Sequence, residues 1–580
     1  MHYKGPALVL AGPGSGKTTV LVERVKNLIL ERNVSPDKIL VVTFARSAAA
    51  QMQERFLRST EGRFASVTFS TIHSVCYSII NSEDSFVNYS LLPENEKTDF
   101  LRKTIQEYFL RFPEQTKVPG LLKDVLMELS AFKKGKNMRG GYKTKYCDRR
   151  LFEYCKNKLE EFKAFNKYFD FDDMAEMTDR LLSSNTELYG RSVRFEYVLV
   201  DEFQDTGADQ FSFLRKLCIE DNFYAVGDED QSIYGFRGAC PEIMLKFREY
   251  FSDCRIYDLP ENFRSHYELV NKSATLIKNN KKRYDKRSLA VLKSENDESV
   301  KILSAKDENE ELDLLISEIR RVAKTSESIA VLVRTRGSLD LVAGKLIQND
   351  INFFVKDKVS NIFEVPVIKT VMSFFEVSAG AGSTDDYIRI FKTTDLKAYE
   401  SFLGSHSFSW ESIRSYYRGD EKVKDFEYKV KSIRKFSPEI ALEFIRNVLG
   451  LDRKISVYEK SKLCEFEMVI KGCENIRSVL DREKTYSEMV ECKNTDKNLV
   501  LSTIHSAKGL EFDRVFIPFM NEGNIPLSKA VSENDTEEER RIFYVALTRA
   551  KNGVTMSFHE SLRNKRAVPS RFLKEMGFLP

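Results

Sequence analysis

A segment near the start of the chain combines glycines, a lysine and hydroxyl residues in the pattern of a phosphate-binding loop. It runs from Ala11 to Thr18 and follows a short apolar run, Ala7–Leu10, that should form a buried strand. Glycines at this spacing let backbone N–H groups turn toward an anion, and a helix that starts in the loop adds its positive end. The strand before the loop and the helical pattern after it argue against an ordinary glycine-rich turn. The residues that we expect around the phosphates of a nucleotide are Gly12, Gly14, Ser15, Gly16, Lys17 and Thr18.

Side chains with a specific chemical task stand in this loop and in a second segment. Lys17 is expected to reach the β- and γ-phosphates, and Thr18 is expected to offer its hydroxyl to Mg²⁺. Asp201 and Glu202 follow another apolar run, Val198–Val200. Asp201 can hold Mg²⁺ directly or through water, and Glu202 can act as a general base toward an attacking water. Acids after a strand mean little alone, but together with the loop they favour nucleotide hydrolysis over binding alone.

The elements that must position these residues alternate between short apolar runs and helical patterns. This alternation predicts an α/β fold with parallel sheets. Two long stretches, residues 79–194 and 376–489, lack such runs and read as amphipathic helices inserted into the α/β halves. Besides the first strand, the expected strands are Ile39–Phe44, Tyr197–Val200, Phe223–Val226, Ile329–Val333, Leu499–Ser502 and Arg514–Pro518.

Composition excludes several classes of protein. The chain has 580 residues, of which 42% are hydrophobic, and 91 Lys and Arg stand against 87 Asp and Glu, a net charge of +4. This balance excludes a histone-like mass of basic residues. Nine cysteines with no C-x-x-C pair, and six histidines, argue against a structural zinc or iron–sulfur site. No apolar run reaches the ~18 residues of a membrane helix and no signal peptide is evident, so we expect a cytoplasmic protein without a membrane partner.

Three charged runs stand out from this balanced background. Two are basic, Lys133–Lys167 and Lys278–Arg287, and one is acidic, Glu533–Glu539. Charge runs are most often solvated, so we interpret the basic ones as helix surface and the acidic one as a loop and helix start.

Seven segments, in a fixed order, resemble the motifs of the UvrD/Rep (PcrA-like) family of superfamily one DNA helicases. Any one of them alone would be compatible with chance, but seven in the family's order are not. The segments are Thr43–Ala49 (motif Ia), Ser70–Ser74 (Ib), Asp201–Thr206 (II), Gly227–Ala239 (III), Glu261–Ser265 (IV), Thr503–Phe512 (V) and Tyr544–Ala550 (VI).

The resemblance implies two RecA-like P-loop NTPase cores with the ATP site in the cleft between them. Each core would be interrupted by a mainly helical insertion, in agreement with the pattern of apolar runs. The implied domains are 1–78 with 195–260 for the first core, 79–194 for its insertion, 261–375 with 490–580 for the second core, and 376–489 for its insertion.

The resemblance also assigns roles around ATP. Gln231 would sense the γ-phosphate, and Arg264 and Arg549 would act as arginine fingers from the second core. A surface salt bridge is the ordinary alternative for an arginine in a helix such as Glu537–Lys551. A planar guanidinium, however, matches the charge that grows on the γ-phosphoryl oxygens during transfer. Three further residues are expected at the nucleotide, namely Thr19, Phe263 and Glu511.

A path for single-stranded DNA follows from the same resemblance. Aromatic faces accept any base, which suits a motor that is indifferent to sequence. Phe44 and Phe236 have the alternative of being core residues, although glycines and an arginine flank Phe236. The residues expected on the path are Phe44, Arg46, His73, Phe236, Arg237 and His505.

These features predict an ATP- and Mg²⁺-dependent translocase or helicase, moving 3′ to 5′ on single-stranded DNA and acting at single-strand/duplex junctions, with possible protein partners in repair, replication or defence. Two departures from the family's pattern qualify the prediction of a helicase. The chain begins too close to the loop for the family's adenine-reading Gln segment, and no Gly-Ile-Gly element occurs near Asp385–Glu400 in the short second insertion. Translocation is therefore better supported than strong unwinding. The alternative is an ATP-switched regulatory or scaffold subunit of a larger DNA-processing complex.

Overall fold

The computed structural model describes residues 2–83, 86, 88–113, 121–135, 144, 147–184, 194–235, 238–292, 299–325, 327–357, 361–393, 409–417, 420–453, 455–491, 498–528, 530–562 and 565–579. These residues form two compact units. The first unit comprises Met1–Glu295 and Ser532–Thr548, and the second comprises Asn296–Val531 and Arg549–Pro580. Each has its own mainly parallel sheet and surrounding helices, so the predicted α/β fold class is confirmed. No helix among the described residues is long and apolar enough to cross a bilayer.

The sheet of the first unit has six parallel strands in the order β3-β2-β6-β7-β1-β8. All strands predicted for this part of the chain are present, and β3 and β8 are additional. Because the strands are parallel, the loops that follow them meet at one edge of the sheet. The bounds are β1 Ala7–Ala11, β2 Ile39–Thr43, β3 Thr68–Thr71, β6 Tyr197–Val200, β7 Phe223–Gly227 and β8 Arg255–Leu259.

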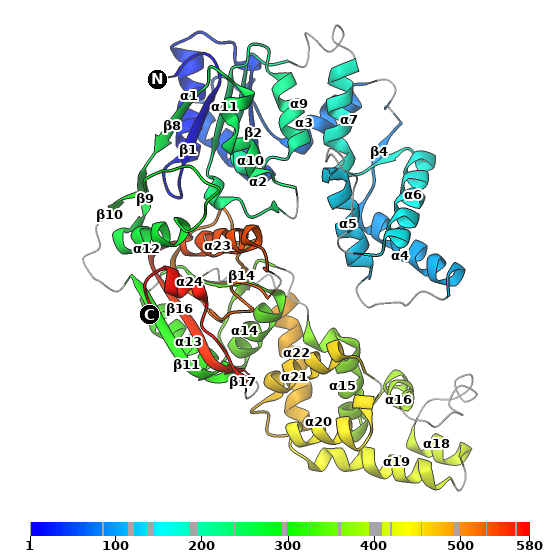
Figure 1. Ribbon diagram of the computed structural model, residues 1–580. Helices are drawn as coiled ribbons and strands as arrows, with labels where there is room; N and C mark the ends of the chain where they lie inside the picture. The colour runs from blue at the N-terminus through cyan, green and yellow to red at the C-terminus, as the bar shows by residue number, and fades with distance from the viewer. Residues whose placement is uncertain are drawn as a thin grey trace. The chain divides into compact units, whose positions relative to one another are not determined.

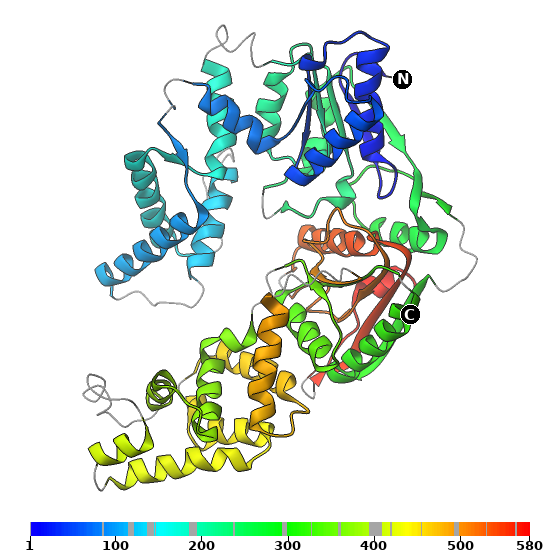
Figure 2. The same ribbon diagram turned by 180° about the vertical axis from the view of Figure 1, so that it is seen from behind.

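Helices cover both faces of this sheet (Figures 1 and 2). On one face, strand residues such as Val9 and Val41 pack against α1 (Lys17–Leu30) and α2 (Arg46–Ser59). Their neighbours in sequence point to the other face and pack against a second group of helices. Strands buried on both faces are apolar throughout, which is why they were recognisable as continuous hydrophobic runs. The second group comprises α3 Ile72–Asn81, α7 Phe171–Ser184, α9 Ala208–Leu217, α10 Pro241–Leu245 and α11 Phe247–Tyr250.

A separate helical core lies in the stretch between α3 and α7. It consists of α4 (Glu94–Arg111), α5 (Leu121–Gly135) and α6 (Arg149–Asn166), which bury their apolar residues against one another. Two short strands, β4 (Ser90–Leu91) and β5 (Tyr168–Phe169), pair at the base of this segment.

Three largely buried lysines surround Asp170, the residue that follows β5, and they are Lys97, Lys133 and Lys163. Lys97 Nζ lies 2.9 Å from Asp170 Oδ2 and Lys133 Nζ lies 3.3 Å from Asp170 Oδ1. Burial alone would raise the pKa of Asp170, but the lysine ammonium groups around it hold that pKa well below its usual range. Lys163 also pairs with Asp173, at 2.9 Å. The interpretation of Lys133–Lys167 as solvated surface is therefore wrong for Lys163, which is buried, and for Lys133, whose side chain is 12% exposed and contacts Asp170 and Asp173.

The first unit ends with a small two-stranded sheet and two packed helices. β9 (Glu261–His266) pairs with β10 (Leu289–Leu292), and α12 (Tyr267–Ile277) packs against α23 (Glu533–Leu547). The predicted helix Glu537–Lys551 extends too far at its carboxyl end, because α23 ends at Leu547. The solvated interpretation of Glu533–Glu539 is also wrong in part, since Glu537 and Glu539 are buried.

The sheet of the second unit has the order β11-β16-β15-β12-β14-β13, all parallel, with β17 antiparallel to β16. The three strands predicted here are present, whereas β11, β13, β16 and β17 were not predicted. The bounds are β11 Val300–Asp307, β12 Ile329–Val333, β13 Phe354–Val355, β14 Leu499–Thr503, β15 Phe512–Ile517, β16 Ala550–Leu562 and β17 Lys565–Arg566.

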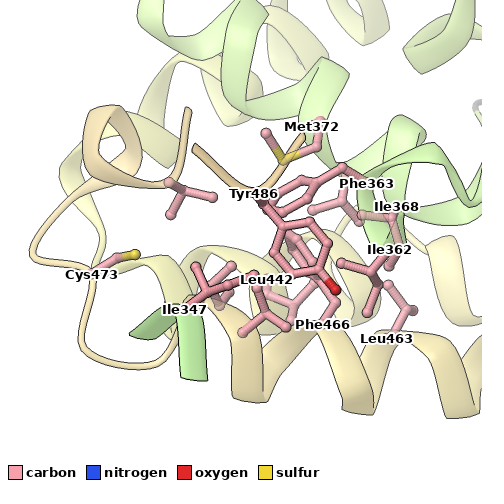
Figure 3. Packing of buried hydrophobic residues seen from close by; sticks show 14 of the residues in the cluster. Ile347, Ile362, Phe363, Ile368, Met372, Leu442, Leu463, Phe466, Cys473 and Tyr486 are labelled. Atoms are coloured by element: carbon pink, nitrogen blue, oxygen red, sulfur yellow. The ribbon is translucent and has the colours of Figure 1, made fainter. Parts of the chain in front are cut away.

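One continuous core joins this sheet to the helices of the second unit. Figure 3 shows part of it, where the Phe363 ring contacts both Tyr486 and Phe466, with ring centroids 5.4 Å and 5.6 Å away. The sheet contributes residues such as Val331 and Leu501 to the same core. The helices of this core are α13 Glu308–Val322, α14 Arg336–Gln348, α15 Pro366–Ala379, α16 Thr384–Phe391, α18 Trp410–Tyr416, α19 Glu421–Ser432, α20 Pro438–Asn447, α21 Val457–Ile470 and α22 Ile476–Glu491. The second unit also contains α24, Arg571–Glu575.

Candidate active site

The loop after β1 has the geometry of a phosphate-binding turn. Gly14 and Gly16 have φ angles of +69° and +83°, in the left-handed region that glycine tolerates best. Ser15 Oγ donates to Gly12 O at 2.8 Å, which tightens the turn. Lys17 is the first residue of α1, and its Nζ donates to Ala11 O at 3.1 Å. The lysine thus folds back across the loop, and Thr18 stands in the first turn of the helix, at its positive end.

The acid pair stands two strands away at the same edge of the sheet. Asp201 follows β6 directly, and its N–H continues the ladder by donating to Val42 O at 2.8 Å. Glu202 has left-handed backbone angles (φ 50°, ψ 45°), which turn the chain sharply away from the sheet. Burial, with help from the Glu202 charge, raises the pKa of Asp201 to about 7, while Lys17 opposes the rise. The buried carboxyl therefore lies within the field of the loop lysine.

Gln204 joins this acid pair to the loop after β7. Its Nε2 donates to Glu202 Oε2 at 2.5 Å, and its Oε1 accepts from the backbone N of Asp228 at 2.9 Å. The side chain is fully buried. We did not select Gln204 from the sequence, although it stands inside motif II.

Gln231 is held by the same loop. Its Nε2 donates to Asp228 Oδ2 at 2.6 Å, and its backbone N donates to Asp228 O at 2.9 Å. Hydrogen bonds therefore run continuously from Glu202 through Gln204 and Asp228 to Gln231. Lys286 contacts Asp228 on its other oxygen. The side chains of Arg283 and Lys286 are only 11% and 8% exposed and pair with acids of motif III, so the interpretation of Lys278–Arg287 as solvated surface is wrong for both.

Phe263 and Arg264, on β9, lie beside the phosphate loop. The backbone N of Phe263 donates to Gly14 O at 3.0 Å, and a Cβ added to Gly14 would lie 2.6 Å from Arg264 Cβ. The Phe263 ring is 55% exposed, and Arg264 Nη1 donates to Thr548 O at 3.2 Å. By their contacts both residues belong to the first unit, with Lys17. Thr19 points outward on α1, where its hydroxyl accepts from Arg55 at 3.4 Å.

Two further predicted nucleotide residues lie in the second unit, at the edge where its strands begin. Arg549 precedes β16, is 2% exposed, and donates from Nη1 to Leu510 O at 3.2 Å. Its surface salt-bridge alternative is therefore wrong. Glu511 precedes β15 and is exposed, with Lys551 Nζ at 3.3 Å.

The predicted DNA-path residues of the first unit lie where β2 and β3 end. Phe44 stacks on Tyr234 with centroids 5.4 Å apart and an interplanar angle of 10°, and the edge of His73 meets Phe171 at 5.5 Å. These four rings line a groove of about 450 Å³. Phe44 is half-buried and is not among the residues of the two cores that pack on the faces of this sheet. Two more predictions, Phe236 and Arg237, lie outside the described residues, and Arg46 is exposed at the start of α2.

The same five residues, Ser-Thr-Ile-His-Ser, occur at the end of a parallel strand in each unit, where the first two are the last residues of the strand. At 70–74 the hydroxyl of Thr71 accepts from the N–H of Ser74 at 3.2 Å, and at 502–506 Thr503 accepts from Ser506 at 3.4 Å. This repeat was missed in the sequence. His73 and His505 therefore occupy equivalent places, each just past the carboxyl end of a strand.

An acid completes the second copy of this turn. Asp357 accepts from the backbone N of Thr503 at 2.6 Å, from Ser502 Oγ at 3.1 Å, and from the Ser506 hydroxyl. It follows β13, which pairs with β14, so the sheet brings the two segments together. Nothing in the sequence around Asp357 indicated this contact.

Comparison with known proteins places these features in a family context. Residues 1–252 match the UvrD/REP helicase N-terminal domain, and residues 257–404 and 410–561 match the UvrD-like helicase C-terminal domain. The chain is 29% identical to the putative ATP-dependent DNA helicase YjcD of Bacillus subtilis (strain 168), over 98% of this chain and 79% of that protein. It is 28% identical to the ATP-dependent DNA helicase Rep of Escherichia coli (strain K12), over 99% of this chain and 92% of Rep. It is 26% identical to the ATP-dependent DNA helicase PcrA of Staphylococcus aureus (strain Mu50), over 99% of this chain and 84% of PcrA.

Proposed function

The chain belongs to the UvrD/REP family of ATP-dependent DNA helicases, and from that membership we propose that it moves along single-stranded DNA in the 3′-to-5′ direction. We further propose that it separates strands at single-strand/duplex junctions, in the cytoplasm, as part of DNA repair, replication or defence. Coupling of ATP hydrolysis to strand movement is the core of this proposal.

One observation carries the hydrolytic half of the proposal. Parallel strands β1, β6 and β7 bring the phosphate loop, Asp201–Glu202 and Asp228–Gln231 to one edge of one sheet. A lysine for the phosphates, a carboxylate for a base and an amide to sense the γ-phosphate are the parts that phosphoryl transfer to water requires. The hydrogen bonds through Gln204 hold the last two in fixed relation.

Mg²⁺ fits the oxygen donors at this edge. The Thr18 hydroxyl and the Asp201 carboxylate would hold it, because Mg²⁺ prefers oxygen ligands and takes one or two protein side chains beside the phosphates. The buried Asp201 carboxyl, whose pKa is raised by burial and by Glu202, is the kind of group that a cation would keep ionised. Bound there, the ion supplies neutralisation of charge on the β- and γ-phosphates.

The chain's own residues then divide the remaining work. Glu202 Oε1 or Oε2 accepts a proton from the attacking water, and Gln204 holds the carboxylate in place through Oε2. Lys17 stabilises the charge on the phosphates. We assign Arg264 and Arg549 the role of arginine fingers, a role that in related NTPases contributes about 10³–10⁵ in rate.

The DNA half rests on the aromatic groove of the first unit. Phe44, Tyr234, His73 and Phe171 offer ring faces and edges beside the exposed Arg46. Stacking of a base on an aromatic ring contributes about 1–3 kcal/mol without regard to sequence. His505 occupies the equivalent place in the second unit, so we propose that both repeats of the turn contact the strand.

Strand displacement on 3′-tailed and 5′-tailed duplexes, with ATP hydrolysis followed in the same reactions, tests the proposal. We expect hydrolysis to need single-stranded DNA, displacement to need the 3′ tail, and both to fall steeply with salt. Lys17→Ala should abolish turnover, and Glu202→Gln should abolish turnover while keeping ATP binding. An ATP hydrolysis rate that does not change with single-stranded DNA would refute the proposal that the protein is a DNA motor. Strand displacement that requires a 5′ tail would refute the proposed 3′-to-5′ direction. Hydrolysis only with a stoichiometric partner would favour an ATP-switched subunit of a larger complex.

A further inference from the structure

Three consecutive acids of motif III are buried side by side. Asp228, Glu229 and Asp230 are at most 2% exposed, and each has a carboxylate oxygen within 4.8 Å of the others. Like charges at this spacing repel strongly in a desolvated site unless a cation lies among them. The described residues supply that cation from a distant part of the chain.

Lys286 fills the space among the three carboxylates. Its Nζ lies 2.9 Å from Glu229 Oε2 and 3.1 Å from Asp230 Oδ2, and it contacts Asp228 Oδ1. The lysine side chain is 8% exposed. Arg283 Nη2 lies 2.8 Å from Asp230 Oδ2 and adds a second positive charge. A lysine therefore occupies the position that a metal ion would take in such a cluster.

The contact with Asp228 links Lys286 to the proposed catalytic residues. Lys286 touches one oxygen of Asp228, while the other oxygen accepts from Gln231 Nε2 at 2.6 Å. The backbone N of Asp228 donates to Gln204, which in turn donates to Glu202. Rotation of the Asp228 carboxylate would move the amide of Gln231, so the ammonium that fixes this carboxylate also fixes the amide.

The segment that carries Lys286 also contacts α23, the helix that leads into motif VI. Lys281 N donates to Glu537 Oε1 at 2.7 Å, and Asn280 Nδ2 donates to Glu537 O at 3.1 Å. From α23, Arg541 Nε donates to Ser232 O at 3.0 Å, next to Gln231. Residues 280–286, which we call the connector, thus touch both motif III and the motif VI helix within the first unit.

We propose that Lys286 is a positioning residue for ATP hydrolysis, holding Asp228 so that Gln231 and Glu202 keep their catalytic geometry, and that the connector links this geometry to α23. The inference deepens the proposed function and rests on it. Lys286 itself touches neither nucleotide nor water in this scheme. If Lys286 had a purely structural role, it would only neutralise the three carboxylates and maintain the fold.

Substitutions of Lys286, compared with a matched buried lysine, distinguish the two roles. Lys286→Met removes the ammonium, and Lys286→Arg keeps the charge but cannot place it at the same point among three carboxylates. Lys97→Met is the control, because Lys97 is equally buried and pairs with Asp170 at 2.9 Å in the helical segment of the same unit. The readouts are kcat and KM of DNA-stimulated ATP hydrolysis, equilibrium ATP binding, and thermal unfolding.

We expect Lys286→Met to lower kcat at least 30-fold and Lys286→Arg at least fivefold, with ATP affinity within threefold of the parent. Lys97→Met should lower the melting temperature but leave kcat within twofold. If Lys286→Met does not fold, Lys286→Arg decides: a kcat reduced by fivefold or more in a folded protein supports the proposal, and a smaller reduction overturns it. A parent protein that fails to exceed Lys17→Ala in turnover refutes the proposed function instead, so the two failures are distinguishable.

Discussion

Replacing Gln204 by alanine should slow ATP turnover without weakening ATP binding. The carboxamide is fully buried and connects Glu202 to Asp228, with donor–acceptor distances of 2.5 Å and 2.9 Å. A hydrogen bond to a charged partner contributes about 1.5–3 kcal/mol, and about 1.36 kcal/mol corresponds to a tenfold change in rate. If the bond orients the general base in the transition state, Gln204→Ala lowers kcat about 10- to 150-fold.

The measurement is the steady-state rate of ATP hydrolysis with saturating oligothymidine, beside equilibrium ATP binding. Gln210→Ala is a matched control, because Gln210 is the same residue type six positions away and its side chain caps α9 by accepting from Gly207 N at 3.0 Å. Loss of that cap should lower stability by about 1 kcal/mol and leave kcat unchanged. A folded Gln204→Ala protein with kcat within twofold of the parent would show that Glu202 needs no help from Gln204, and the reasoning would fail.

Three further changes test separate parts of the structure. Gly14→Ala should weaken ATP binding about tenfold or more, because Gly14 has φ +69° and an added Cβ would lie 2.6 Å from Arg264 Cβ on β9. Gly62→Ala is the control, because Gly62 has a similar φ of +77° but no atom within 4 Å of an added Cβ. Its equilibrium ATP binding should be unchanged. Asp357→Ala removes three hydrogen bonds to the segment Ser502–Ser506 and should lower the free energy of unfolding by about 1.5–3 kcal/mol. Unfolding can be read from the fluorescence of Trp410, the one tryptophan in the chain, which is buried in the same unit. Asp170→Asn should destabilise the protein by about 3–5 kcal/mol at pH 7 in urea unfolding. Because the pKa of Asp170 is depressed in the folded protein, the ionised carboxylate stabilises the fold only above its unfolded pKa of about 3.9. The difference in unfolding free energy between Asp170→Asn and the parent should therefore shrink below about pH 4. A difference that is constant with pH would contradict the ion cluster.

Much of the fold was predictable because its central strands are buried on both faces. Runs such as Ile39–Val42 are apolar at every position and can be recognised without knowing their neighbours. β16 was missed for the opposite reason. It begins two residues after a helix and carries Lys551, Asn552 and His559 among its apolar residues, so no single period marks it. Neighbours in the folded sheet, rather than local composition, decide that this segment is a strand.

The residues of the candidate site also fall into two groups, those that the sequence alone indicated and those that it did not. Candidate residues that belong to one short motif, such as Lys17 or Asp201, could be selected from the sequence because the spacing of the motif is itself the signal. Lys286 was not found, because its partner Asp228 is 58 residues away and its own neighbourhood has the composition of a solvated surface. Asp357 was not found either, since it caps Thr503 from 146 residues away. Long-range polar contacts leave no periodic trace in a single sequence.

The most informative of these contacts concern the point where the chain passes from one compact unit to the other. α23 ends at Leu547 within the first unit, and Arg549 is the first residue of the returning chain in the second. The connector holds α23 at Glu537, and the same connector holds Asp228 through Lys286. In the proposed scheme Gln231 responds to loss of the γ-phosphate. Contacts through Asp228, Lys286 and the connector then link Gln231 to α23, from which the chain continues to Arg549. On this argument, weakening the connector at Asn280 should uncouple DNA stimulation from ATP hydrolysis. Asn280→Ala is expected to lower the DNA-stimulated turnover by a larger factor than the unstimulated turnover, so that the ratio of the two rates falls. An equal loss in both rates would mean that α23 takes no part in the coupling.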